Sequence, residues 1–309
     1  MSDISFFAAG LRMDRSADPT EHLPNSYVSR RSTEAQAFDD WTPPGGTLGA
    51  LTDEARARAA TLQPRAAELR QRASIADQPP SFRDALCRTD VAVIAELKRS
   101  SPSKGAINPG LDPVAQCLAY QTGGAAAVSI LTEPTQFGGS NEDLSRVRDA
   151  VSLPLLKKDF HVDVVQMFEA RALGSSAALV IARAVPPTRV RELFAAASDI
   201  GLEVLLEIRD ERELELAMSI GASIVGVNSR DLETLQIDLE TAPRILPLIP
   251  RDVVVIAESG VRSALDVERL AEAGADAVLV GSVVSASLDP AGTVRSLTGI
   301  RRTSGARKS

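Results

Sequence analysis

Short apolar runs that end in a polar residue or a glycine recur along this chain and constrain its fold more than any other feature. Six of them span residues 91–98, 153–158, 203–207, 224–228, 253–258 and 277–281, and end in Lys98, Lys158, Glu207, Asn228, Glu258 and Gly281. Ionisable groups at the ends of apolar strands are costly to bury unless they face a common solvent-filled opening. A closed ring of parallel strands provides one, because the carboxyl ends of all its strands open onto the same face.

Strand and helix patterns alternate along most of the chain. We expect strands at 91–97, 125–132, 153–158, 177–182, 203–208, 224–228, 253–258 and 277–281. Amphipathic helices are expected at 112–122, 141–150, 162–173, 187–200, 210–220, 238–248, 262–273 and 289–297. Eight such units in series predict a (β/α)8 TIM barrel of the α/β class. An open doubly wound sheet is the alternative, and it is disfavoured because no Gly-x-Gly-x-x-Gly follows the first strand.

The two ends of the chain differ from this repeating region. Residues 1–46 mix Asp, Ser, Arg, Thr and Pro without sustained periodicity, which predicts a disordered N-terminal extension. The catalytic barrel is expected over 47–299, and it includes an extra N-terminal helical segment that begins near Leu48. Residues 300–309 are expected to form a frayed basic tail.

Composition and charge restrict the possible partners. No apolar run approaches the roughly 18 residues that span a bilayer, so we expect no membrane partner. Residues 4–10 lack a basic leader, and a cytoplasmic location is therefore expected. The net charge of -7 argues against a nucleic-acid partner, yet it permits a small phosphorylated ligand, which responds to local charge. A monomer or a weak homo-oligomer is expected.

Cysteine and histidine are too scarce for several kinds of active site. Cys87 and Cys117 match no metal or redox spacing, and the two histidines are His22 and His161. Histidine-based triads and multi-histidine metal sites are therefore disfavoured, and we expect no metal and no cofactor.

The alternation of side chains along a strand predicts which polar groups share the barrel interior. Glu96 and Lys98 point the same way, and Lys158 rather than Lys157 joins them if Leu156 is inward. By the same rule two later strands direct glutamates inward, Glu207 and Glu258. A buried salt-bridge lattice that merely fills the barrel is the alternative. Two lysines, three glutamates and an asparagine on five strands favour a working site.

Glycines at the ends of the last two strands predict a phosphate site. The segments Glu258-Ser-Gly-Val261 and Val280-Gly-Ser282 place Gly260 and Gly281 at or just past the strand ends. Small residues let backbone N–H groups approach an anion, and barrels commonly bind phosphate at the loops after strands 7 and 8. The loop over 98–105 combines positive charge, hydroxyl groups and a glycine, as a lid over an anionic substrate would. A solvated basic loop is the alternative.

Several of these segments together resemble the indole-3-glycerol phosphate synthase family. The resemblance rests on Ile94-Ala-Glu-Leu-Lys-Arg-Ser-Ser-Pro-Ser-Lys-Gly105, Phe137-Gly-Gly-Ser140, Leu156-Lys-Lys-Asp-Phe160, Gly226-Val-Asn-Ser-Arg-Asp-Leu232 and Ile256-Ala-Glu-Ser-Gly260. It runs in order from about Leu48 to Leu297. Residues 1–46 lie outside it, and Gly281-Ser-Val-Val matches the family's last phosphate loop loosely.

The resemblance implies a carboxy-lyase of tryptophan biosynthesis. Its substrate would be 1-(2-carboxyphenylamino)-1-deoxyribulose 5-phosphate, and it would close the indole ring with loss of CO2 and water. Lys158 matches the family's general acid, and a lysine can serve near neutral pH if its site lowers its pKa. Glu207 matches the base, and Glu96 would assist proton transfer or hold the lysines.

Substrate-binding roles follow from the same resemblance. Lys98 and Arg230 would pair with the carboxylate and phosphate ends in an order that the sequence leaves open. The remaining substrate-binding positions are Ser101, Pro102, Phe160, Asn228, Glu258 and Ser259. The phosphate would be held by Gly260, Gly281 and Ser282. Phe160 could instead be a core residue, and Ser259 could instead simply form a turn. Asp159 and Asp231 are expected to be structural.

Two other functions compete with this one. A phosphoribosylanthranilate isomerase typically uses a cysteine and an aspartate at strand ends, and neither Cys87 nor Cys117 ends a predicted strand. A non-catalytic barrel that binds partners through its N-terminal extension would be favoured by loss of Lys158 or Glu207, and both residues are present.

Overall fold

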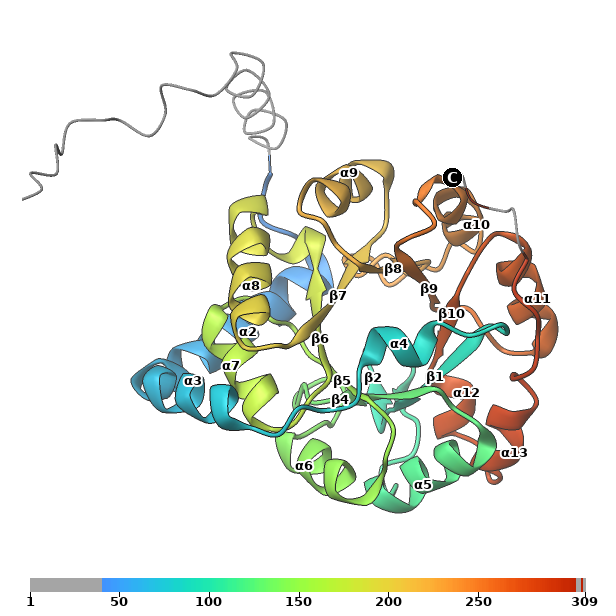
Figure 1. Cartoon of the computed structure of the whole chain (residues 1–309), viewed down its shortest axis with the longest axis horizontal. Helices are drawn as coiled ribbons and strands as arrows, with labels where there is room; N and C mark the ends of the chain where they lie inside the picture. The colour runs from blue at the N-terminus through green and yellow to red at the C-terminus, as the bar shows by residue number, and fades with distance from the viewer. Residues whose placement is uncertain (1–40, 304–306, 308–309) are drawn as a thin grey trace, which may run out of the picture. The chain divides into compact units, whose positions relative to one another are not determined.

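The computed structural model describes residues 41–303 and 307, and within them eight parallel strands close into a barrel (Figure 1). The strands are β1 (Ala92–Leu97), β4 (Ala127–Leu131), β5 (Leu155–Lys158), β6 (Ala177–Ile181), β7 (Glu203–Ile208), β8 (Ile224–Asn228), β9 (Val254–Glu258) and β10 (Ala277–Val280). Each strand pairs with its neighbours in the chain, and β10 pairs with β1 to close the ring. The predicted TIM barrel is confirmed.

Helices follow the strands and form the outer layer. They are α5 (Pro113–Gly123), α6 (Asn141–Ala150), α7 (Val164–Ala172), α8 (Pro187–Asp199), α9 (Glu211–Ser219), α10 (Thr241–Ile245), α11 (Ala264–Glu272) and α13 (Pro290–Arg295). Asp112 caps α5 by accepting a hydrogen bond from the Ala115 amide, and Pro113 takes the first helical position. Gly124 ends that helix with φ of 93°, a left-handed conformation that suits glycine.

Three local features differ from the expected elements. The helix expected over 238–248 is α10 followed by a 3-10 turn, η3 (Leu246–Leu248), because Pro247 has no N–H to continue α-helical hydrogen bonding. The loop after β1 contains a small hairpin of β2 (Ser100–Ser101) and β3 (Gly105–Ala106). A four-residue helix, α12 (Ser282–Ser285), follows β10.

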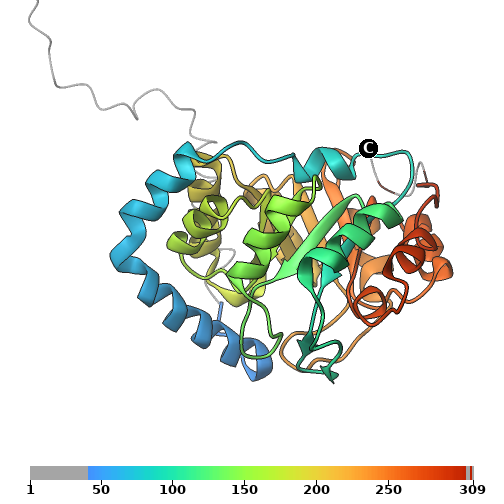
Figure 2. The same cartoon turned by 90° about the horizontal axis from the view of Figure 1, so that it is seen from below.

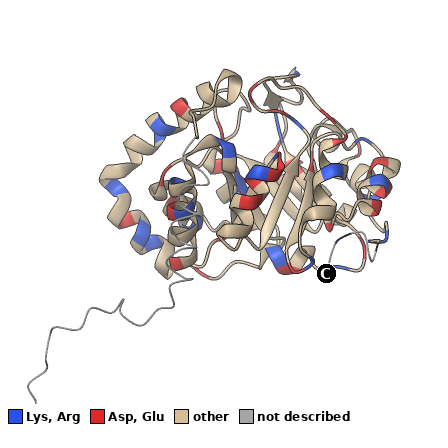
Figure 3. Cartoon of the chain, turned by 90° about the horizontal axis from the view of Figure 1, so that it is seen from above, with Lys and Arg blue, Asp and Glu red and all other residues tan. Residues whose placement is uncertain are grey.

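The extra N-terminal segment is helical, as predicted. It consists of α2 (Gly46–Leu62), η1 (Gln63–Arg65) and α3 (Ala66–Ile75), and these helices lie along one flank of the barrel (Figure 2). The short helix α4 (Phe82–Leu86) then leads to β1. Acidic and basic residues both lie along α2 and α3, whereas most residues of the barrel strands are uncharged (Figure 3). In the part of the chain that the structure describes, no helix has the length and apolar character needed to cross a membrane.

The frayed tail expected at 300–309 lies partly outside the described residues. Of those that the structure describes, Arg302 and Arg307 both bind Asp276. Arg307 also donates to the carbonyl oxygens of Pro250 and Val253, at 3.2 and 2.7 Å, and is buried. A buried carboxylate is costly unless it is paired. The charge of Asp276 therefore holds both arginines in place. The predicted disorder of the N-terminal extension concerns residues that, up to position 40, lie outside the described part.

Candidate active site

A cavity of about 300 Å³ opens at the carboxyl ends of the barrel strands. Every residue that the sequence predicted for the site lines it: Glu96, Lys98, Ser101, Pro102, Lys158, Phe160, Glu207, Asn228, Arg230, Glu258, Ser259, Gly260, Gly281 and Ser282. The register explains this convergence, because Asn228 pairs with Glu258, and Leu131 pairs with Lys158, at the same level of the barrel. Residues far apart in the chain therefore face one small space.

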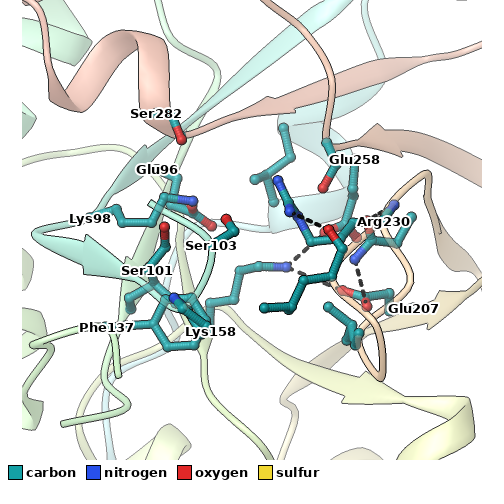
Figure 4. Close-up of a pocket in the computed structure, with 18 of the residues that line it drawn as sticks. Glu96, Lys98, Ser101, Ser103, Phe137, Lys158, Glu207, Arg230, Glu258 and Ser282 are labelled. Carbon is teal, nitrogen blue, oxygen red and sulfur yellow. Dashed lines mark hydrogen bonds and ion pairs between the residues drawn. The ribbon is translucent and has the colours of Figure 1, made fainter. Parts of the chain in front are cut away.

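Lys158 occupies the centre of this site. Its Nζ lies 2.7 Å from Glu258 Oε2 and 3.3 Å from Glu207 Oε2 (Figure 4). Asn228 Nδ2 donates to Glu207 Oε1 at 2.9 Å and fixes the second carboxylate. The neighbouring Lys157 points the other way, toward α7, and is only 1% exposed. The predicted choice of Lys158 as the inward lysine is confirmed.

The carboxylates around Lys158 reverse the expected direction of its pKa shift. Burial alone lowers the pKa of Lys158, but the charges of Glu258, Glu207 and Glu96 outweigh burial and raise it above its usual value. The lowered pKa considered from the sequence is therefore wrong for this arrangement of side chains. Lys158 therefore holds its proton at neutral pH.

The pKa of Glu258 is also raised, but by burial rather than by its neighbours of opposite charge. Burial raises the pKa of Glu258, and Lys158 partly offsets this while Glu207 adds to it. Its Oε1 is buried without a hydrogen-bond partner among the described residues. Gly226 on the adjacent strand provides the space for this oxygen, because a Cβ at Gly226 would collide with it.

Glu96 and Lys98 form a second ion pair on the other side of the cavity, with 2.5 Å between Nζ and Oε1. Gly281 lies against both of these side chains, and a Cβ at this position would overlap the Glu96 carboxylate. Glycine is thus required at the end of β10 for the pair to form. The arrangement places the Lys98 ammonium beside the predicted phosphate loops.

The rim after the last two strands is built from backbone. Ser259 and Gly260 both have left-handed φ, at 65° and 92°, and turn the chain directly after β9. After β10, α12 begins at Ser282, and the first N–H groups of a helix have no partners within it. Both segments line the cavity, so they can offer backbone donors to an anion there.

The β2–β3 hairpin covers part of the cavity through residues 101–104. Arg99 fixes the base of this hairpin by binding both carboxylate oxygens of Asp143. The same guanidinium donates to the carbonyl oxygens of Leu111 and Gly138. The sequence predicted a lid here but did not identify Arg99 as its anchor.

An apolar wall completes the cavity, and most of its residues were not predicted from the sequence. The rings of Phe137 and Phe160 lie 6.4 Å apart with a tilt of 39°. Other wall residues come from β4 and β6: Leu131, Leu179 and Ile181. Phe137 could have been identified, because it stands just before the Gly-Gly pair that follows the second barrel strand. Thr47 and Leu51 of α2 also line the cavity, but helical periodicity does not reveal where a helix docks.

Asp159 is the anchor of the β5 end, as expected for a structural residue. It accepts hydrogen bonds from Arg58 of α2 at 2.7 Å and from Thr132 at 2.8 Å, and Lys157 lies 3.4 Å away. Burial raises the pKa of this carboxyl, but Lys157 and the other partners outweigh it and lower the pKa to about 2. Asp159 thereby joins α2 to the strand that carries Lys158. Over residues 41–303 and 307, no group of His, Cys, Asp or Glu is arranged to hold a metal ion.

Comparison with known proteins identifies close relatives of the chain. Residues 50–297 match the family model described as "Indole-3-glycerol phosphate synthase". Two proteins with that name are similar over most of their length. The protein from Streptomyces griseus is 45% identical over 252 residues, which cover 81% of this chain and 94% of the relative. The one from Mycobacteroides abscessus is 43% identical over 255 residues, which cover 82% and 94%.

Solved structures resemble the chain in fold. The 3-hexulose-6-phosphate synthase from Salmonella typhimurium superposes with a TM-score of 0.54 at 15% identity, over 67% of this chain and 96% of that one. The protein KGPDC from Streptococcus mutans gives a TM-score of 0.51 at 14% identity, over 67% and 95%. At these identities the likeness supports the barrel alone.

Proposed function

Because the chain belongs to the indole-3-glycerol phosphate synthase family, we propose that Lys158 and Glu207 perform the acid–base steps of indole ring closure at the mouth of its barrel. The enzyme is a decarboxylating lyase of tryptophan biosynthesis. Its substrate is 1-(2-carboxyphenylamino)-1-deoxyribulose 5-phosphate, and its reaction releases CO2 and water.

Lys158 acts as the general acid in the first step. The arene carbon that bears the carboxylate attacks the ketose carbonyl, and the carbonyl oxygen takes a proton from the Lys158 ammonium. Loss of CO2 then restores the aromatic ring. The raised pKa of Lys158, which Glu258 and Glu207 cause, ensures that the proton is present when the substrate binds.

Glu207 acts as the base in the second step. Lys158, once it carries a proton again, protonates the new hydroxyl group, which leaves as water, while Glu207 removes a proton from the carbon of the former ketose that lies next to the nitrogen. Asn228 holds one oxygen of Glu207, so the other oxygen is directed at Lys158 and the substrate. The 3.3 Å separation lets Glu207 return its proton to Lys158 after the step. Glu96 holds Lys98 and adds negative charge beside Lys158.

Binding roles follow from the distribution of charge and apolar surface. Lys98 lies against Gly281, so we assign it to the phosphate, together with the backbone at Gly260, Gly281 and Ser282. We assign Arg230, which lies across the cavity from Lys98 in Figure 4, to the carboxylate. The aromatic ring packs against Phe160. The remaining predicted contacts surround the substrate. Ser101 and Pro102 belong to the lid, and Glu258 and Ser259 lie at the rim at the end of β9.

One observation carries this proposal: a single lysine between two carboxylates, at 2.7 and 3.3 Å, in a cavity with both an apolar wall and an anion rim. The test is indole formation. Purified protein and the carboxyphenylamino-ribulose phosphate should generate indole fluorescence, and Lys158→Ala should remove it while thermal unfolding shows a folded variant. Undiminished turnover in that variant would mean that another group is the acid. An inactive wild type would leave the non-catalytic barrel as the better account.

Two expectations remain proposals. We propose a cytoplasmic enzyme that is a monomer or a weak homo-oligomer. Light scattering coupled to gel filtration measures the second property, and a stable tetramer would contradict it.

A further inference from the structure

A second cavity of about 120 Å³ lies directly behind the proposed base, Glu207. It shares part of its wall with the active site, namely Ile181, Glu207, Asn228, Arg230 and Leu232. The rest of its wall contains Leu48, Arg183, Ile208, Arg209, Asp210, Glu213, Asp231 and Glu233. This side cavity therefore extends from a buried carboxylate, which is 3% exposed, to the exposed Asp210 at the start of α9.

The side cavity is suited to water. Its volume exceeds the roughly 10–15 Å³ that one water requires, and most of its wall is charged. Arg209 Nε, at this wall, is buried and has no acceptor among the described residues. A buried donor without a partner is costly, and a water in the side cavity would satisfy it.

The reaction needs a supply of protons. The substrate brings an ionised carboxylate, and that group leaves as neutral CO2, so each turnover takes up one proton from the solvent. Lys158 gives up its proton when the ring closes, at a stage when the substrate and the hairpin over 101–104 occupy the mouth of the barrel. A route that avoids the mouth would restore Lys158 before the hydroxyl group leaves.

We propose, on the basis of the function above, that Glu213 relays solvent protons through the side cavity to Glu207. The protonated Glu213 carboxyl gives its proton to a water, the water protonates the Glu207 carboxylate, and Glu207 passes the proton to the neutral Lys158 amine. Glu213 is then protonated again from solvent, because its side chain is partly exposed. Glu213 acts through Glu207 and does not touch the substrate.

The surroundings of Glu213 suit this role. Burial, and after it the charges of Asp210 and Glu207, raise the pKa of Glu213 to about 8, against the opposing effects of the hydrogen bond from the Arg209 amide and the charge of Arg183. A large share of the population therefore carries the proton near neutral pH. The other charged groups of the side cavity are Arg230, Arg209, which pairs with Asp231, and Glu233, which pairs with Arg183.

Glu213 also has a structural role, and the test must separate the two. Its Oε2 accepts a hydrogen bond from the Arg209 amide at 2.7 Å, and its own amide donates to Asp210 at 2.8 Å at the start of α9. A glutamine can accept the first of these hydrogen bonds through its amide oxygen but cannot carry a proton. Glu213→Gln therefore keeps the cap and removes the relay. Glu215→Gln is the matched control, because Glu215 is on the same helix and is exposed.

The experiment measures kcat for the wild type, E213Q and E215Q at increasing imidazole concentration, near pH 7 and at constant ionic strength. We expect kcat of E213Q to fall about tenfold, less than the loss of about 10²–10⁴ typical of a direct general acid or base. Imidazolium, as a small acid, should restore it, whereas the wild type and E215Q should not respond.

Each other outcome would overturn the relay. Equal kcat in E213Q and E215Q would show that protons arrive by another route. A loss that imidazole does not restore would show that Glu213 serves only as a cap. A wild type without indole formation would remove the function on which the relay rests, so this failure is distinguishable from the other two.

Discussion

Adjacent lysines on β5 show how closely side-chain direction determines chemistry. Lys158 faces the cavity with two carboxylates, whereas Lys157 faces α7 and pairs with Asp159 and Glu169 at 3.4 Å. Each lysine is thus neutralised by its own set of acids. A shift of one residue along β5 would exchange the two and place the proposed acid behind the barrel wall.

Asp159 should contribute stability that depends on pH. Its pKa in the folded protein is about 2, against an ordinary value of 3.8, so the ionised form stabilises the fold by about 2 kcal/mol. This contribution is complete above about pH 4 and is lost as the pH falls toward 2. We expect Asp159→Asn to lower the free energy of unfolding at pH 7 and to affect it much less at pH 2–3, as measured by urea unfolding.

A matched control for Asp159→Asn is Asp53→Asn. Asp53 forms an ion pair with Arg56, but its side chain is 75% exposed, and exposed pairs contribute little. If Asp159→Asn were no more destabilising at pH 7 than this control, the buried network around Asp159 would not stabilise the protein.

Glu258 should determine the pH range in which Lys158 remains an acid. Among the neighbouring charges, Glu258 makes the largest contribution to the raised pKa of Lys158. We expect Glu258→Gln to lower that pKa, so kcat/KM should begin to decline at a lower pH on the alkaline side. The pH profile of indole formation measures this shift. An alkaline limb that stays in place would show that Lys158 is not the group that titrates there.

At the scale of elements, periodicity predicted most of the fold. Each barrel strand was placed to within two residues, because apolar runs between helices have clear ends. The β2–β3 hairpin and α12 were missed because they are only two to four residues long and depend on tertiary contacts. The position of α2 over the cavity was missed for a related reason: Thr47 and Leu51 carry no signal of what they face.

The lid is an element whose anchor can be tested. Arg99 holds the base of the β2–β3 hairpin through Asp143, and this part-buried pair should limit the freedom of the hairpin before substrate binds. We expect Arg99→Ala to raise KM about tenfold, because a loosened lid must be ordered during binding at a cost of about 1.4 kcal/mol. Steady-state kinetics give KM and kcat separately.

The control for the lid anchor is Arg146→Ala. Arg146 pairs with Asp112 at 3.0 Å, and both side chains are about half exposed. The control should leave KM unchanged. Equal KM values for wild type and Arg99→Ala would mean that the hairpin is ordered by contacts other than this ion pair.

At the scale of the whole molecule, the two ends of the barrel have different tasks. The carboxyl ends of the strands carry Lys158, Glu207 and Glu258, whose buried charges form the proposed acid–base site. The opposite end carries Asp276, whose Oδ2 accepts the Val255 amide and whose charge is met by Arg302 and Arg307. Barrels commonly separate activity and stability in this way, so substitutions at the two ends should change different measured quantities.

Arg307→Ala tests this separation. The variant leaves Asp276, which is 2% exposed, with one cation fewer, and it removes the donor to the Pro250 and Val253 carbonyl oxygens. We expect a loss of about 2 kcal/mol, which corresponds to about 4–8 °C in Tm for a domain of this size, with KM and kcat unchanged at 25 °C. Arg301→Ala removes the same charge from an exposed side chain and should leave Tm unchanged. A drop in activity without a drop in Tm would show that the two ends are coupled.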